Sequence, residues 1–277
     1  MEVRWQYLIP SEFEKLVKEE KVCLLPIGCL ERHGEHMPYG TDTILAHNVS
    51  VRAAQLEPCV VFPEYYFGLS HGSACYTGTI SVPNQLLFGM LENLVDEIAR
   101  NGFKKIIIVN GHGGNDIFLR YFMMEQINRK VDYTLYYTNF YQGDRYNQLD
   151  IWEAPGGGHA DEEETSWIMA VAPESVHMEH IPFEEPIGEP TKLAHLKYVH
   201  TPLWWYDLYP EHTSGTPSAA TREKGEKALD TLAHDLAERI RAIKEDTAVP
   251  ALQQEFYSRM DMVKKAEKEF RAKLKDE

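Results

Sequence analysis

The chain has 277 residues, of which 43% are hydrophobic, so it can bury a sizeable core as one large domain or two small ones. Its 28 Lys and Arg against 43 Asp and Glu give a formal net charge of −15, which disfavours nucleic acid and anionic membranes as partners. No apolar run of about 18 residues occurs, and the four cysteines lack CxxC spacing, so we expect a soluble protein of a reducing, cytoplasmic compartment.

Four short apolar segments are expected to be the strands of one sheet: residues 22–28, 59–68, 105–111 and 132–140. The first three lack the alternation of a half-exposed strand, which indicates that both their faces are buried. Helical patterns lie between the strands, at residues 41–57, 84–102 and about 115–129. This order predicts a mostly parallel sheet with helices on both faces.

The second half of the chain is expected to be less regular. Three glycines at residues 156–158 precede HADEEETS (159–166), which is expected to open a helix that continues to about residue 172. An irregular region with the aromatic group LWWYDLY (203–209) follows, and helix returns from about Ala219. The last segment is charged and helical in period, so we divide the chain into a domain, residues 1–248, and a C-terminal helical extension, residues 249–277.

Polar side chains gather where the expected strands end. LERHGEHMPYGTD (30–42) follows the first strand, NGHGGN (110–115) the third, and HADEEETS the glycine loop. Ligands of open α/β sheets bind at the carboxyl ends of the strands, so we expect these clusters to meet. The first cluster could instead be a solvated polar loop that binds nothing. The second has the alternative of a phosphate-binding loop, although neither GxGxxG nor GK[ST] is matched.

The spacing in the first cluster suits a pair of metal ions. Glu31 and His33 are two residues apart, so in an extended segment they point to the same side and could each hold one ion. Asp42, at the expected start of a helix, could bridge both ions, because a carboxylate has two oxygens. His112 is delivered to the end of the third strand by a glycine-rich turn and is expected to be a further metal ligand.

The third cluster is interpreted through helix geometry. If the helix includes residue 159, His159 shares a face with Glu162 and Glu163, whereas Glu164 is rotated away. We therefore expect Glu162 to point at the site. The alternative is that the acidic run is a solvated helix N-terminus, stabilised by the helix dipole.

PIGCLERHGEHMPYGTD, NGHGGN and HADEEETS, in this order, resemble the signature blocks of the creatininase (creatinine amidohydrolase) family, over roughly residues 5–245. The resemblance implies a three-layer α/β/α sandwich with a mostly parallel central sheet. It also implies two divalent metal ions per subunit, zinc or manganese and in some members iron, and a homo-oligomer, commonly a hexamer. The metal ligands it implies are Glu31, His33, Asp42 and His112, with Asp42 bridging, and it implies proton transfer by His159.

The sequence departs from creatininase itself at several positions. Gly114 stands where that enzyme has a glutamate ligand, so Glu162 or Glu164 is expected to supply the missing ligand, with Glu162 preferred on helix geometry. Ser73 stands at a position where the family has a histidine. The glycines at 156–158, before HADEEETS, stand where creatininase has a tryptophan and an acidic residue that contact creatinine. Creatinine is therefore not the expected substrate.

We expect a hydrolase that attacks a small cyclic amide or formamide through a metal-bridging hydroxide, because two bridged ions activate water and polarise a carbonyl. His159 would protonate the leaving group, and Glu162 would complete one metal shell or handle a proton. One alternative is carbon–carbon hydrolysis that opens a cyclic diketone of sugar or inositol catabolism; another is a non-enzymatic metal-binding protein.

The remaining histidines and the aromatic group carry no site prediction. His36 is expected either to orient a ligand or to be structural. A surface position is expected for six histidines: His177, His180, His195, His200, His212 and His234. The aromatic group is expected in the core or at a subunit interface: Trp204, Trp205, Tyr206 and Tyr209.

Overall fold

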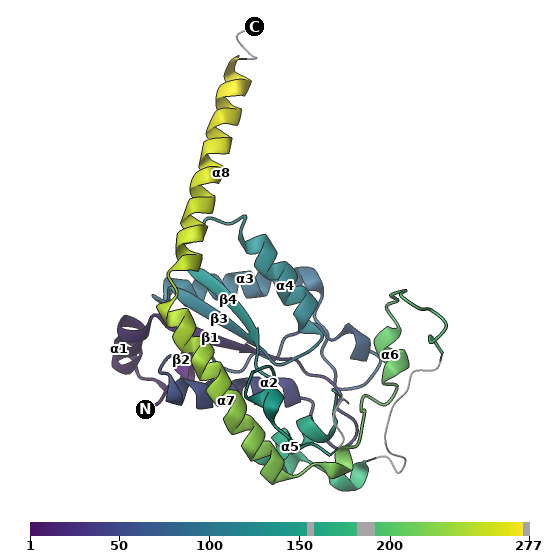
Figure 1. Ribbon diagram of the computed structural model, residues 1–277. Coiled ribbons are helices and arrows are strands. Elements are labelled where there is room, and N and C mark those ends of the chain that lie inside the picture. Colours follow the sequence, from purple (N-terminus) through teal and green to yellow (C-terminus); the bar gives the residue numbers. More distant parts are fainter. Residues whose placement is uncertain (154–157, 182–191, 274–277) are drawn as a thin grey trace.

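The computed structural model describes residues 1–153, 158–181 and 192–273, so Gly156 and Gly157 of the expected glycine loop lie outside the described residues. Its sheet has the strand order β2-β1-β3-β4, and all neighbouring pairs are parallel (Figure 1). The strands are β1 (Val22–Ile27), β2 (Val60–Val61), β3 (Lys105–Asn110) and β4 (Thr134–Asn139). The expected parallel sheet is confirmed.

Strand β2 is much shorter than the ten residues expected from its apolar run. Its last ladder contact is the Phe62 amide, which donates to Leu24 O at 2.8 Å. Pro63 follows and has no N–H to continue the ladder, so β2 ends there and only an isolated parallel bridge between Ile27 and Tyr65 follows.

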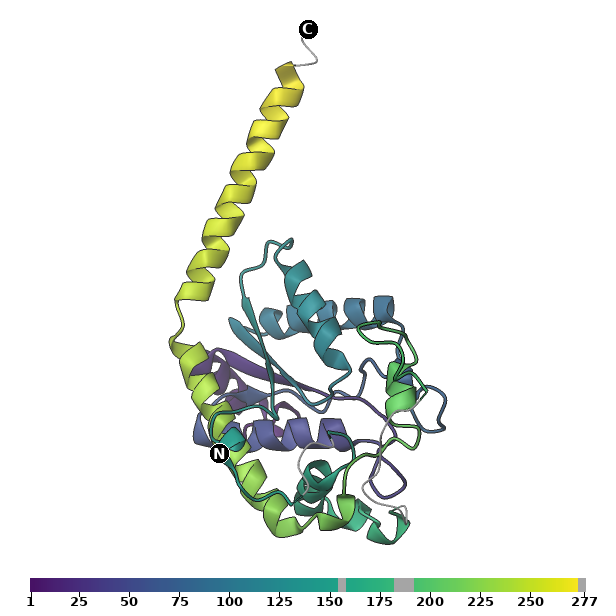
Figure 2. The ribbon, with the colours of Figure 1, turned by 45° about the vertical axis from the view of Figure 1, so that its right-hand side comes forward.

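Helices cover both faces of the sheet and complete three layers (Figures 1 and 2). One face packs against α2 (Thr41–Leu56), α5 (Glu162–Val171) and α7 (Arg222–Glu245), and the other against α1 (Pro10–Glu20), α3 (Asn84–Arg100) and α4 (Asn115–Gln126). Successive strand side chains alternate between two buried clusters, as Leu24 and Leu25 illustrate. The expected α/β/α sandwich is confirmed, whereas α1 was not expected.

Two glycines let the start of α2 lie against the strand ends. A Cβ on Gly28, after β1, would lie 2.3 Å from Thr43 N. A Cβ on Gly111, after β3, would lie 2.3 Å from Asp42 O. A side chain at either position would push α2 away from the sheet, so these glycines fix Asp42 at the carboxyl ends of β1 and β3.

The segment between α5 and α7 is irregular, as expected, with short 3₁₀ turns at Pro173–Ser175, Met178–His180 and Pro217–Ala219. Its short helix α6 (Trp204–Leu208) contacts the 3₁₀ turn His71–Ser73. The cysteines are unpaired: Cys23, Cys29 and Cys59 are buried and Cys75 is exposed. A search of the described helices finds no candidate membrane span.

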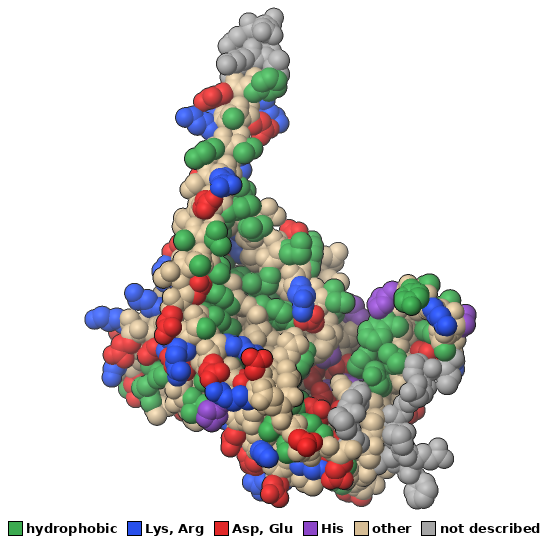
Figure 3. All heavy atoms as spheres, viewed as in Figure 1, with side chains coloured by type: hydrophobic (Ala, Val, Ile, Leu, Met, Phe, Trp, Pro, Cys, Tyr) green, Lys and Arg blue, Asp and Glu red, His purple; other side chains and the backbone are tan. Residues whose placement is uncertain are grey.

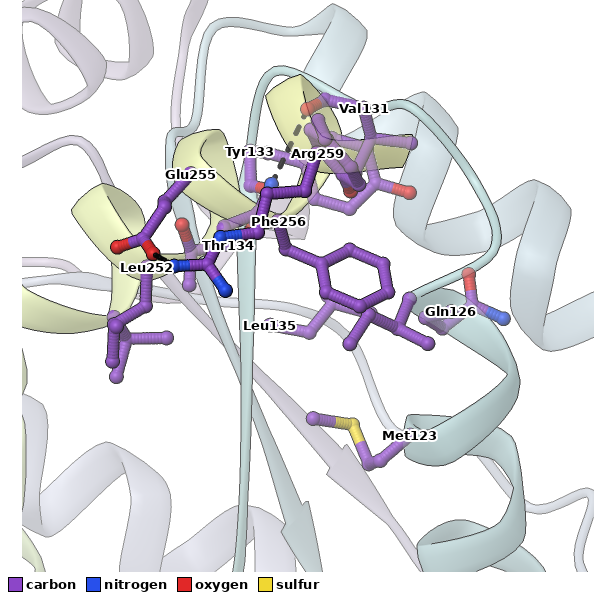
Figure 4. A pocket seen from close by; sticks show the side chains of 14 residues that line it. Met123, Gln126, Val131, Tyr133, Thr134, Leu135, Leu252, Glu255, Phe256 and Arg259 are labelled. Atoms are coloured by element: carbon purple, nitrogen blue, oxygen red, sulfur yellow. Dashed lines mark hydrogen bonds and ion pairs between the residues drawn. The ribbon is translucent and has the colours of Figure 1, made fainter. Parts of the chain in front are cut away.

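Helix α8 (Ala248–Lys273) projects from the body, and beyond the ion pair between Asp261 and Lys130 its outer turns stand clear of the rest of the described chain (Figures 1 and 2). Hydrophobic side chains are exposed along this part (Figure 3), among them Val263 and Phe270, which are 67% and 63% exposed. At its root, Gln253 Nε2 donates to Tyr133 O at 2.9 Å. A cavity of about 440 Å³ remains between this root and α4, with Phe256 directed into it (Figure 4).

Candidate metal centre

The chain stays extended after β1, so alternate side chains point the same way. The amide of Ile80 donates to Leu30 O at 3.0 Å and the amide of Glu31 donates to Tyr39 O at 3.0 Å, which hold this segment in place. Cys29, Glu31 and His33 are each 2% exposed or less. This polar segment is therefore buried, and it is not a solvated loop.

Asp42 lies between two histidines from different elements. Its Oδ1 lies 3.1 Å from Nε2 of His33, and its Oδ2 lies 2.9 Å from Nδ1 of His112. Nδ1 of His112 also lies 3.1 Å from Oε2 of Glu31. Since each Asp42 oxygen faces a different imidazole nitrogen, the geometry suits a carboxylate shared between two ligand groups.

Backbone carbonyls orient both imidazoles. Nδ1 of His33 lies 3.0 Å from Glu31 O, and Nε2 of His112 lies 3.0 Å from Leu69 O. A ring nitrogen beside a carbonyl oxygen donates its hydrogen, which leaves the lone pair of the other nitrogen directed at the carboxylates. Asn110 fixes the turn, because its Oδ1 accepts from the His112 amide at 3.1 Å.

Helix α5 begins later than expected. It starts at Glu162, and the N-cap is Asp161, whose Oδ1 accepts from the amides of Glu163 and Glu164 at 3.0 Å each. His159 precedes the helix, and Ala160 has a positive φ of 50°. The expected helical spacing between His159 and Glu162 therefore does not exist.

The prediction that the Glu162 side chain points at the site is wrong. Its buried carboxylate accepts from Lys224 Nζ at 2.6 Å and from the Glu153 amide at 3.0 Å, so it faces α7. Glu164 occupies the expected place instead: its Oε2 lies 3.7 Å from Nε2 of His33 and 2.7 Å from the amide of Ala160.

Two groups of potential metal ligands share Asp42. Each group has ligand atoms that all lie within 4.8 Å of one another: Cys29, Glu31, Asp42 and His112 in one, and His33, Asp42 and Glu164 in the other. The set combines imidazole nitrogens with carboxylate oxygens in a buried setting. These are donors that zinc and manganese accept, so the residues fit a two-ion centre.

The carboxylates favour positive charge at the histidines. Burial alone would lower the pKa of His33, but the carboxylates of Asp42, Glu164 and Glu31 together outweigh it and raise this pKa to about 10. At His112, burial is likewise outweighed by Glu31 and Asp42, and the pKa is raised to about 9. Burial raises the pKa of Glu164 to about 8. Without a metal, protons supply the positive charge that this cluster requires.

His159 is brought to the same place, as expected. Its ring lies 4.3 Å from that of His33, centroid to centroid, and its Nε2 lies 3.0 Å from Arg32 O. Burial, and then the charge of His33, lower the pKa of His159 to about 3. Its imidazole is therefore neutral at neutral pH.

The aromatic group divides into two pairs. The rings of Trp205 and Tyr209 lie 5.2 and 6.4 Å from that of His159, so these two lie beside the site. The prediction of a subunit-interface position for the group stays a prediction. Trp204 and Tyr206 are 40% and 45% exposed and do not contact His159 among the described ring pairs.

Three site residues were missed or misplaced from the sequence. His212 was expected at the surface, but it is fully buried and its Nδ1 lies 3.9 Å from Oε1 of Glu31. Ser73 Oγ donates a hydrogen bond to the same Glu31 oxygen. Cys29 was detectable, because it precedes Glu31 by two residues and so shares its side of an extended chain.

The other histidines follow expectation. Five lie at the surface: His177, His180, His195, His200 and His234. His36 is buried, and its Nε2 lies 3.0 Å from Thr165 Oγ1 on α5, so it connects the first and third clusters and does not reach the carboxylates as a ligand.

The sequence and the fold match a known family. The family model for creatininase, described as creatinine amidohydrolase, matches residues 6–240. The chain belongs to the creatininase family. Among curated relatives of this creatininase-family protein, the 3-dehydro-scyllo-inosose hydrolase of Thermotoga maritima is 26% identical, covering 88% of this chain and 84% of the relative. The creatinine amidohydrolase of Pseudomonas putida is 27% identical, covering 83% and 93%.

Solved structures agree with the family fold. A manganese form of creatininase has a TM-score of 0.72 at 25% identity and covers 89% of this chain and 100% of its own. A zinc–zinc form of a creatininase variant has a TM-score of 0.74 at 24% identity, with the same coverage. Helix α8 lies beyond the residues that the family model matches.

Proposed function

We propose that this creatininase-family hydrolase binds two divalent ions at the strand ends, with Asp42 as the ligand common to both. Glu31 and His112 would complete one protein ligand set, and His33 and Glu164 the other. The observation that carries this proposal is the position of the Asp42 carboxylate. Its Oδ1 lies 3.1 Å from Nε2 of His33, and its Oδ2 lies 2.9 Å from Nδ1 of His112. The manganese and zinc–zinc forms of creatininase support zinc or manganese, and the same donors accept iron.

Glu164 replaces Glu162 in this proposal because the Glu162 carboxylate faces Lys224 on α7, whereas Glu164 lies beside His33. The packing around Gly114 explains why this ligand comes from α5. The resemblance to creatininase implies a glutamate ligand at the position of Gly114. Here a Cβ on Gly114 would lie 2.4 Å from Nε2 of His112 and 2.8 Å from Leu69 O, so a glutamate would displace the His112 ring. The carboxylate is instead supplied from α5, whose Glu164 is 16% exposed and adjacent to His33.

The two ions would supply a Lewis acid for a substrate carbonyl and an activated water as nucleophile. His159 would move the proton. Since its Nε2 donates to Arg32 O at 3.0 Å, Nδ1 is the nitrogen able to accept a proton from the attacking water. The low pKa of His159 favours its passing that proton on to the leaving group. Trp205 and Tyr209 cover one side of the imidazole and would exclude bulk water.

The substrate class proposed is a small cyclic amide or formamide, although creatinine itself is not expected. The similarity to creatinine amidohydrolase supports amide hydrolysis. The similarity to 3-dehydro-scyllo-inosose hydrolase favours, as a second candidate, carbon–carbon hydrolysis that opens a cyclic diketone. Both reactions need attack of water on a polarised carbonyl, so the same residues serve either one.

A product assay on the metal-loaded protein separates the candidates. Lactams, formamides and cyclic diketones would be supplied in parallel, with amine, formate and total new carboxylate measured. We expect release of amine or formate. New carboxylate from diketones alone would favour the second candidate. No turnover of any class by protein that holds two ions per subunit would contradict the proposed substrate classes.

We also propose that the chain forms a homo-oligomer in which α8 contacts a second copy. Val263 and Phe270 are seven residues apart and lie on one face of α8. Residues 260–273 hold five Lys and Arg against three Asp and Glu, in a chain with net charge −15. On the body, α4 exposes an apolar stripe, Ile117, Tyr121 and Met124. The basic charge and apolar face of α8 in one copy therefore complement the acidic charge and the apolar stripe on the body of a second copy.

A further inference from the structure

Cys29 brings a fourth, chemically different donor to one half of the proposed metal centre. Its side chain is fully buried. Its Sγ lies 3.1 Å from Oδ2 of Asp42 and 3.9 Å from Oε2 of Glu31. Together with Nδ1 of His112 these ligand atoms all lie within 4.8 Å of one another.

The strand geometry aims the thiol inward. Cys29 and Glu31 alternate with Leu30, whose backbone pairs with Ile80 in an antiparallel bridge. This pairing keeps the segment extended, so Cys29 and Glu31 point to the same side. The other cysteines do not approach the centre: Cys23 lies in the core between the sheet and α3, Cys59 in the core beside α2, and Cys75 is exposed.

The separations between these donor atoms bracket those of a tetrahedral coordination shell. Zinc ligands at about 2.0–2.1 Å for nitrogen or oxygen and about 2.3 Å for sulfur stand roughly 3.3–3.6 Å apart in a tetrahedron. Four separations among these donors are given by the structure. Oδ2 of Asp42 lies 2.9 Å from Nδ1 of His112, which lies 3.1 Å from Oε2 of Glu31, and the two sulfur separations are 3.1 and 3.9 Å.

We propose that the Cys29 thiolate is a ligand of the ion held by Glu31, Asp42 and His112. This inference rests on the two-ion site of the proposed function. As the sulfur–metal bond forms, the thiol proton passes to solvent, and no electron is transferred. The two halves then differ in kind: one includes a soft thiolate, and the other, with His33, Asp42 and Glu164, has only nitrogen and oxygen donors.

This asymmetry gives the centre a metal preference. Thiolate favours zinc, cobalt or ferrous iron over manganese, whereas a site of imidazole and carboxylates accepts manganese readily. The half that contains Cys29 therefore selects zinc from a mixture of zinc and manganese. A thiol that only donates a hydrogen bond to Asp42 would leave the two halves with the same preference.

The thiolate can be detected without measuring catalysis. Metal-free full-length protein would be titrated with Co²⁺, and thiolate-to-cobalt charge transfer followed in the near ultraviolet. We expect the band to saturate at one of two equivalents in the wild type and to be absent in Cys29→Ser. Cys75→Ser is the matched control and should keep the band. In Cys29→Ser we also expect zinc affinity to fall at one site only, by more than the roughly 10- to 100-fold that loss of a hydrogen-bond partner of a ligand costs, measured by chelator competition.

X-ray absorption at the zinc edge of the wild-type protein makes the test independent of any variant. A single sulfur scatterer at about 2.3 Å from zinc is the expected result. Two bound ions with neither a sulfur scatterer nor a charge-transfer band would overturn the role of Cys29 and leave the two-ion site standing. Failure to bind two ions at all would instead overturn the proposed function.

Discussion

The carboxylate of Glu162 lies 2.6 Å from the ammonium of Lys224 and faces α7, on the side of α5 away from the strand ends. Glu164, two residues further, faces the strand ends beside His33. Two neighbouring glutamates of one helix therefore serve different purposes. One holds α5 to α7, and the other is the proposed metal ligand.

The first prediction compares these glutamates by isosteric substitution. Glu164→Gln should lose one ion and most activity with little change in melting temperature. Glu162→Gln should keep both ions but lose about 1–3 kcal/mol of unfolding free energy, because it weakens a buried hydrogen bond to a charged group. Metal analysis and denaturant unfolding of both variants make the comparison. Loss of metal from Glu162→Gln, with Glu164→Gln fully loaded, would contradict the assignment.

The prediction for Glu162 was wrong because it assumed a helix that begins before residue 162. HADEEE is compatible with a helix that begins at any of several residues, and each choice rotates the acids to a different face. The deciding signal was Asp161 followed by Glu164 three residues later, which is the spacing of a capping box. Using it would have placed the helix start at Glu162. With that start, His159 lies outside the helix, so helical spacing from His159 no longer favours Glu162 over Glu164 as the residue that faces the site.

The second prediction concerns Asp42. Asp42→Asn keeps the size of the side chain but removes its charge, so both ions should bind at least tenfold more weakly. Glu31→Gln should weaken only one ion. Competition with a chelator, followed separately for the first and the second bound ion, measures the affinity of each site in both variants. An Asp42→Asn protein that loses one ion and holds the other at wild-type affinity would rule out a shared ligand.

The third prediction follows from the raised pKa values of two proposed ligands. His33 and His112 have pKa values of about 10 and 9 in the metal-free fold, above the ordinary value of 6.5, so both carry protons at pH 8. Metal binding at pH 8 should release at least these two protons, and metal affinity should rise with pH up to about 10, where His33 has also lost its proton. Calorimetry in buffers of different ionisation enthalpy counts the protons; a count of zero contradicts the prediction.

The same pKa shifts predict the pH dependence of metal-free stability. Because the folded values lie above the unfolded ones, the stabilising contribution is fully present below about pH 6.5 and is lost as pH rises through 9 and 10. Metal-free protein should therefore lose unfolding free energy between pH 7 and 10. Metal-loaded protein should lose much less of it, since the ions replace the protons. Equal losses in both forms would contradict this account.

The fourth prediction addresses His159. His159→Gln should retain both ions while kcat falls by about 10²–10⁴-fold, the usual contribution of a general acid or base. Steady-state kinetics and metal analysis on the same sample measure both quantities. His234→Gln, at an exposed position on α7, serves as the matched control. Activity of His159→Gln within twofold of wild type would exclude the proton-transfer role.

The fifth prediction concerns α8. Val263→Glu with Phe270→Glu should reduce the oligomer mass in light scattering without changing metal content, because it places charge on the proposed contact face. Gln254→Glu with Ser258→Glu adds the same charge at exposed positions of the helix and should leave the mass unchanged. A protein that is monomeric before any substitution would contradict the proposed contact.

The sequence anticipated the sheet, the α2 to α4 helices and five of the clustered side chains: Glu31, His33, Asp42, His112 and His159. Apolar runs identify β1 and β3, and a parallel sheet brings their carboxyl ends together, so Glu31, Asp42 and His112 meet. His212 could not be anticipated in this way. It enters from an irregular segment after α6, where neither periodicity nor ligand spacing indicates a position in space.

The central claim is that one carboxylate joins two metal sites, and an anomalous difference map from crystals of zinc- or manganese-loaded protein tests it most directly. We predict two peaks on opposite sides of the Asp42 carboxylate. One should lie against Glu31 and His112, and the other against His33 and Glu164. A single peak, or two peaks of which one does not contact Asp42, would contradict the account.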